Sequence, residues 1–101
     1  MGTTLEFSKI GELYVAETTV TENFMLHLDR KKTGRIYMWQ RASEDVEYAP
    51  CDIGEYIGNN IGLSFEYSFI SGVYPDGGLH IKVESESEVT KGVIYYSSNN
   101  E

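Results

Sequence analysis

The chain has 101 residues, 16 Asp or Glu side chains against eight Lys or Arg, and a formal net charge of -8 with a pI near 4.6. This acidity argues against nonspecific binding to nucleic acid or to anionic membranes, because both need a surplus of basic side chains. A basic protein partner is favoured instead, although acidity also serves solubility by itself. The length fits one domain, expected to span residues 1–101 with a frayed tail at 97–101.

Composition predicts an all-β fold. Val, Ile and Thr supply 22 residues and the aromatic residues 13, whereas Ala supplies only three. β-Branched and aromatic side chains suit pleated, half-buried surfaces. We therefore expect a single antiparallel β-sandwich or small barrel of about seven to eight strands, mostly connected as a meander.

The sequence carries no segment for membrane insertion. No apolar run approaches the about 18 residues of a membrane span, and the amino terminus lacks the basic and apolar regions of a signal peptide. Cys51 is the only cysteine, so no intramolecular disulfide forms. We expect a soluble protein with a lean towards the cytoplasm, and secretion stays open if a signal peptide has been removed.

The first strands are predicted from hydrophobic alternation. Residues 5–10 and 12–21 form either one long strand broken at Gly11 or two short strands. Residues 24–29 and 35–42 are predicted to pair as a hairpin. The segment between them is polar and ends in Gly34, which can take positive φ.

Alternation fails between residues 43 and 60, where turn-forming residues gather. Ser43 and the acidic pair after it have the pattern of a helix cap, and residues 52–55 have capping-box spacing. One short helical turn between residues 43 and 58 is therefore predicted. A loop or a brief extra strand is an equal alternative.

A second hairpin is predicted from residues 61–70 and 79–83, both of which alternate strictly. Its register sets Phe69 against Leu79 and places Glu66 opposite Lys82, because opposed unlike charges stabilise an antiparallel pair. The connecting loop, residues 70–78, carries Tyr74 and Asp76 and is long enough to be functional. Residues 93–96 form the last strand.

The first hairpin carries the most suggestive surface. With Leu26, Leu28, Ile36 and Met38 facing the core, a mixed aromatic and basic set shares the other face. We predict a binding platform made of His27, Tyr37, Trp39 and Arg41. Tyr and Trp stack on sugar rings or anchor protein interfaces, and Arg adds directed hydrogen bonds. The alternative is a hairpin buried on both faces, with Trp39 in the core and His27 satisfied locally.

An acidic surface is predicted at Glu84, Glu86 and Glu88. On one strand face these carboxylates recur at about 6.7 Å, close to the spacing of phosphates along a nucleic-acid strand. This spacing suggests a decoy for a nucleic-acid-binding groove or a docking surface for a basic protein. An ordinary solvated face that protects the strand against edge pairing is the default interpretation.

Catalytic and metal signals are weak. Cys51 with His27 or His80 is the one thiol and imidazole combination, but no family signature surrounds the cysteine, which is more simply a small buried hydrophobe. The carboxylates around Asp45 and Asp76 lack EF-hand spacing. No catalytic residue, metal site or cofactor is predicted.

These features favour a noncatalytic binding or protein–protein interaction module that acts through surface recognition. The expected partner is another protein rather than nucleic acid, and the acidity of the chain favours a basic one. A carbohydrate-binding module that uses Trp39 and Tyr37 is one alternative. An acidic decoy inhibitor of a nucleic-acid-binding protein is another, and a small hydrolase is the weakest.

Overall fold

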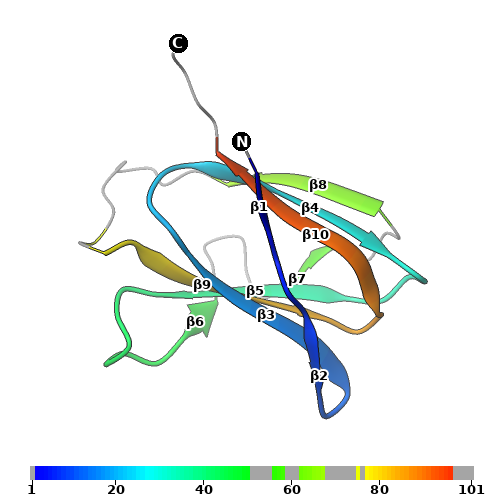
Figure 1. The fold of residues 1–101 in the computed structure, drawn as a ribbon. Helices are drawn as coiled ribbons and strands as arrows, with labels where there is room; N and C mark the ends of the chain where they lie inside the picture. The colour runs from blue at the N-terminus through cyan, green and yellow to red at the C-terminus, as the bar shows by residue number, and fades with distance from the viewer. Residues whose placement is uncertain (1, 51–55, 59–61, 68–74, 76, 97–101) are drawn as a thin grey trace.

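The computed structural model describes residues 2–50, 75 and 77–96, together with the backbone of residues 56–58 and 62–67 (Figure 1). Within these residues every regular element is a strand, and none is a helix. The strands are β1 (Gly2–Thr4), β2 (Ser8–Ile10), β3 (Leu13–Val20), β4 (Phe24–Arg30), β5 (Ile36–Arg41), β6 (Ala49–Pro50), β7 (Tyr56–Gly58), β8 (Gly62–Tyr67), β9 (Leu79–Ser85) and β10 (Val89–Tyr96).

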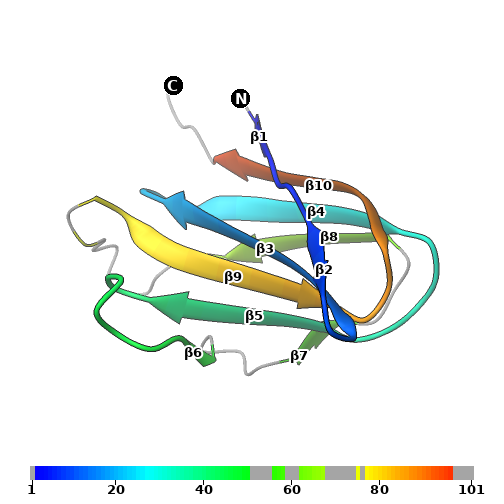
Figure 2. The ribbon, with the colours of Figure 1, turned by 60° about the horizontal axis from the view of Figure 1, so that its bottom comes forward.

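The strands form two antiparallel sheets that lie on each other as two layers (Figures 1 and 2). The smaller sheet has the order β1-β10-β4-β8. The larger sheet has the order β2-β3-β9-β5-β6, and β7 also pairs with β5. The all-β prediction is confirmed, and of the two predicted forms the structure has the sandwich.

The strand pairs are nested along the chain. β1 pairs with β10, β3 with β9, β4 with β8 and β5 with β7. The chain thus doubles back on itself as one long hairpin, which folds over into two sheets in the manner of a jelly roll. The expected meander is wrong, because most consecutive strands lie in different sheets.

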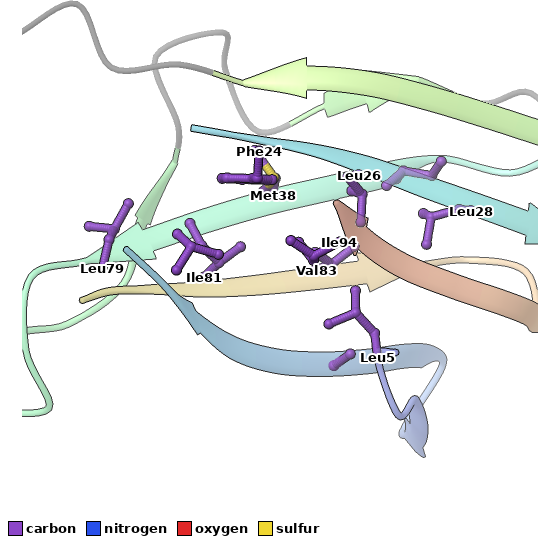
Figure 3. Packing of buried hydrophobic residues seen from close by; sticks show 12 residues of the cluster. Leu5, Phe24, Leu26, Leu28, Met38, Leu79, Ile81, Val83 and Ile94 are labelled. Carbon is purple, nitrogen blue, oxygen red and sulfur yellow. The ribbon is translucent and has the colours of Figure 1, made fainter. Parts of the chain in front are cut away.

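The core lies between the sheets and follows the alternation of the sequence (Figure 3). Strand β9 alternates buried and half-buried residues along its whole length. The side chains predicted to face inward from β4 and β5 are fully buried, with exposed fractions of 0% for Leu26, Leu28, Ile36 and Met38. Ile81 and Val83 meet them from β9. The predicted inner faces of β4, β5 and β9 are therefore confirmed, whereas the side chains of residues 61–70 lie outside the described residues.

The first predicted hairpin is wrong in its pairing. β4 belongs to the smaller sheet and β5 to the larger one, so residues 31–35 cross between the layers. Gly34 does take positive φ, at 155°, and a Cβ there would lie 3.1 Å from the Glu86 side chain. A short polar turn with glycine suits a crossover as well as a hairpin, and local sequence does not distinguish the two.

The second predicted hairpin is also wrong. β8 pairs with β4, whereas β9 lies in the other sheet between β3 and β5. Glu66 is opposite Met25, and Lys82 lies between Glu17 and Trp39. Both segments alternate apolar and polar residues in the sequence, and such alternation cannot tell neighbours in one sheet from neighbours across the sandwich.

The remaining predictions have mixed outcomes. Gly11, at φ 63°, turns β2 into β3, so the two-strand alternative holds. Residues 43–46 form a turn, closed by a 3.2 Å bond from Val46 N to Ser43 O, where a helical turn was expected. The alternative of a brief extra strand is realised as β7. Residues 51–55 and the tail at 97–101 lie outside the described residues.

Candidate functional site

The outer face of the larger sheet gathers aromatic and charged side chains from its three central strands. Because Ile36 and Met38 point into the core, the residues between and after them point outward from β5. Register places Lys82 of β9 next to Trp39 and, on its other side, next to Glu17 of β3. We call this set the aromatic and charged face: Glu17, Tyr37, Trp39, Arg41, Lys82 and Glu84.

Trp39 is held in place by the neighbouring strand. Its Nε1 donates a 2.9 Å hydrogen bond to Oε1 of Glu84, and the Lys82 ammonium lies 5.6 Å from the Trp39 ring centroid. Lys82 Nζ is also 3.8 Å from Oε2 of Glu84. The Lys82 and Glu84 side chains are only 25% and 16% exposed, so salt screens this group less than a fully exposed pair.

Tyr48 covers part of this face from the Tyr48 loop, which we define as residues 42–48 between β5 and β6. Its ring centroid is 4.3 Å from the Arg41 guanidinium carbon and 4.7 Å from Lys82 Nζ. Its hydroxyl donates a 2.8 Å hydrogen bond to Oε1 of Glu17. Burial, and then the hydrogen bond and charge of Glu17, raise the pKa of Tyr48 to about 12, with Arg41 opposing the shift. The phenol therefore stays a donor.

Tyr37 extends the face towards the end of the sandwich. Its hydroxyl donates to Oε2 of Glu86 at 3.3 Å, and Oε1 of the same carboxylate accepts the Arg35 backbone N–H at 2.8 Å. The ring is half-buried. Tyr37 is thus oriented by its own contacts and does not need a ligand to hold it.

The predicted platform is divided between the two sheets. Tyr37, Trp39 and Arg41 lie together on β5, but His27 is on the outer face of the smaller sheet. There it is opposite Val93, and its Nε2 lies 3.1 Å from Oδ1 of Asp29. His27 therefore does not share a face with Tyr37, Trp39 and Arg41, because the predicted hairpin between β4 and β5 does not form. His27 is satisfied locally, as the alternative had it, while Trp39 is half-buried on the outside of the sandwich.

The acidic surface has a different geometry from the one predicted. β9 ends at Ser85, so Glu86 and Glu88 belong to the crossover that leads into β10 and do not continue a strand face. Each carboxylate has a partner in the chain: Glu84 binds Trp39, Glu86 binds Arg35 and Tyr37, and Glu88 is 3.3 Å from Lys31 Nζ. The continuous strand that the predicted spacing assumes therefore ends before Glu86 and Glu88.

The other sequence candidates add no site in the described residues. Cys51, Tyr74 and Asp76 lie outside them. Among the side chains that are described, no three from His, Cys, Asp and Glu come close enough to hold a metal ion. The same part of the chain includes no helix long and apolar enough to cross a membrane.

A charged pocket of about 240 Å³ opens at one end of the sandwich, beside the β2–β3 hairpin. Its charged lining is balanced, with three cations against three carboxylates: Lys9, Lys31, Lys32, Glu12, Glu86 and Glu88. Two of these, Lys31 and Glu88, already pair with each other. The pocket therefore has no clear preference for the charge of a ligand.

Sequence reasoning missed three members of the site: Glu17, Tyr48 and Lys82. Glu17 and Lys82 lie on polar faces that alternation does reveal, but their proximity to Trp39 depends on which strands pair. Tyr48 lies in a segment without periodicity, and no local signal indicates that its ring folds back onto β5 and β9.

Comparison of the chain with protein-family models, with curated proteins and with solved structures finds no match. The fold alone does not assign an activity, because one architecture serves many unrelated functions. Function is therefore argued from the chemistry of the aromatic and charged face.

Proposed function

We propose that the protein is a noncatalytic binding module that recognises another protein through the aromatic and charged face. The observation that carries this proposal is the clustering of Tyr37, Trp39 and Arg41 with Lys82 and Glu84 on the outside of the larger sheet. Tyr, Trp and Arg are the residue types that contribute most to protein interfaces.

The aromatic side chains of this face are held in place before any partner binds. Trp39 is fixed by Glu84, and Tyr37 by Glu86, so these rings lose little conformational entropy when a partner binds. The face also presents cations and carboxylates side by side. Such mixed charge gives a partner's polar groups complementary contacts and so favours specificity.

The test compares two double variants with matched chemistry on opposite sheets. Tyr37→Ser with Arg41→Gln alters the aromatic and charged face, whereas Met25→Gln with Tyr95→Ser alters the outer face of the smaller sheet, where both residues are exposed. Protein captured from cell extract on the immobilised chain is quantified by mass spectrometry, after thermal unfolding has shown that both variants fold. We expect specific partners to fall about tenfold with the first variant and to be retained with the second.

Equal capture by all three proteins, or loss with the smaller-sheet variant alone, contradicts the proposal. A glycan array probed with the same proteins separates the carbohydrate alternative. If the unmodified chain binds a glycan but captures no protein, and the Tyr37 and Arg41 double variant loses the glycan, the ligand is a sugar and not a protein.

A further inference from the structure

Tyr48 occupies the centre of the aromatic and charged face through contacts to three different strands. Its hydroxyl bonds Glu17 of β3, and its ring lies over Arg41 of β5 and Lys82 of β9. The surface thus places cations against the π face of the ring and a carboxylate against its hydroxyl, which are the favourable partners of each part of a phenol. The face therefore has a formed slot for a phenol.

The loop that brings Tyr48 there is otherwise weakly attached. Most of its residues are exposed, and Val46 is half exposed at 50%. It contributes no residue to the hydrophobic core, and β6, which follows it, pairs with β5 over only two residues. The bond from Arg41 to Val46 O is long, at 3.4 Å. A segment with so few buried contacts opens at low free-energy cost.

The closed loop also leaves a donor unsatisfied. Among the buried side-chain polar atoms of the described residues, Nε of Arg41 is without a hydrogen-bond partner. Burying a charged donor without an acceptor is unfavourable, and such atoms are rare in folded proteins. The Tyr48 ring lies 4.3 Å from this guanidinium and offers its π face in place of an acceptor. Displacement of the loop would expose Nε of Arg41, which could then donate a hydrogen bond to an acceptor.

We infer that the Tyr48 loop is a displaceable occupant of the binding face, and that the partner inserts a tyrosine side chain of its own where Tyr48 lies. This inference rests on the proposed function and names the group that is recognised. The incoming ring would stack on Arg41 and Lys82 and donate to Glu17, while a backbone carbonyl of the partner accepts from Nε of Arg41. A sugar is a poorer fit, because its C–H faces are not attracted to cations as an aromatic face is.

The test uses N-acetyltyrosinamide as the probe and follows the indole N–H signal of Trp39, the single tryptophan, by nuclear magnetic resonance. We expect Tyr48→Ala to bind the probe about tenfold more tightly than the unmodified chain, because the competing ring is gone. Tyr48→Phe keeps the ring but loses the bond to Glu17, and we expect intermediate affinity. Tyr95→Ala removes an exposed tyrosine from the other sheet and should match the unmodified chain.

Two further arms make the result decisive. N-Acetylphenylalaninamide should bind Tyr48→Ala more weakly than the tyrosine probe, and Glu17→Gln in the same background should reduce that preference. Equal probe affinity in the unmodified chain, Tyr48→Ala and Tyr48→Phe would overturn the inference and leave Tyr48 as an anchor for its loop. The proposed function fails separately, when the Tyr37 and Arg41 double variant captures the same proteins as the unmodified chain.

Discussion

At the scale of single residues, Tyr48 is the side chain whose chemistry the fold alters most clearly. Burial raises its pKa, Glu17 adds to the shift through a hydrogen bond and its charge, and Arg41 partly offsets both. Glu17 and Arg41 also position the ring. Position and protonation of Tyr48 are therefore coupled, since the phenolate would face the Glu17 carboxylate at hydrogen-bond distance.

This coupling predicts a distinctive alkaline titration. The folded pKa of Tyr48, about 12, is above the ordinary tyrosine value of 10.0, so the contribution of Tyr48 to stability is complete below pH 10 and is lost as pH rises towards 12. The difference in tyrosinate absorbance between the unmodified chain and Tyr48→Phe should therefore appear well above pH 10. Glu17→Gln should move that difference to lower pH. A difference that titrates at pH 10 in the unmodified chain contradicts the assignment.

At the scale of elements, two crossovers between the sheets are joined at one end of the sandwich. Residues 31–35 and residues 86–88 exchange backbone bonds, from Lys31 N to Glu88 O and from Glu86 N to Arg35 O, both at 3.0 Å. Beneath them Arg30 is only 4% exposed and donates to Oγ of Ser85 at 3.1 Å. Burial lowers the pKa of the Arg30 guanidinium, and the charge of Glu86 opposes that shift.

The side chain of Ser85 links these crossovers, so we expect loss of its hydroxyl alone to lower stability substantially. Its Oγ accepts from Arg30 and from Ser87 N, and it donates to Ser87 O at 2.7 Å. Ser85→Ala should lower the free energy of unfolding by about 1–3 kcal/mol, because buried donors lose their acceptor. Urea denaturation measures this loss.

The matched control is Ser8→Ala on β2, where the serine is exposed. This change should alter the free energy of unfolding by less than about 0.5 kcal/mol. If Ser85→Ala is as mild as the control, the buried serine does not hold the crossovers together.

At the scale of the whole molecule, stability comes from pairs far apart in the chain. Gly2 is opposite Tyr95, and Val20 is opposite Leu79. Strands β4, β10, β3, β9 and β5 each pair on both sides, whereas β1, β2 and β6 lie at or near sheet edges. Opening a central strand breaks two ladders and exposes the core, so we expect a graded resistance to local unfolding.

Amide hydrogen exchange tests this gradation. We expect the slowest exchange in β4, β9 and β10, and fast exchange in the Tyr48 loop and β6, which pairs over only two residues. Tyr48→Ala should accelerate exchange in the loop and leave β9 unchanged. Protection in the loop equal to that in β9 would show that the loop does not open independently.

Local pattern predicted the inner faces but not the strand pairs. Alternation correctly places Leu26, Leu28, Ile36 and Met38 in the core, because the direction of a side chain depends only on its position along the strand. Pairing depends on which strands meet after the chain has folded over. The turn at residues 31–35 suits a hairpin and a crossover equally. Because it forms a crossover, His27 and Trp39 lie on different sheets.

The sequence by itself therefore determined the fold class, the dry faces of β4, β5 and β9, and the outward direction of Tyr37, Trp39 and Arg41. All of these follow from composition and a two-residue period. Only the tertiary structure decided that Lys82 lies beside Trp39 and that Tyr48 returns to cover both. The physical reason is that such contacts join segments far apart in the chain, and their selection depends on the packing of the two sheets as a whole.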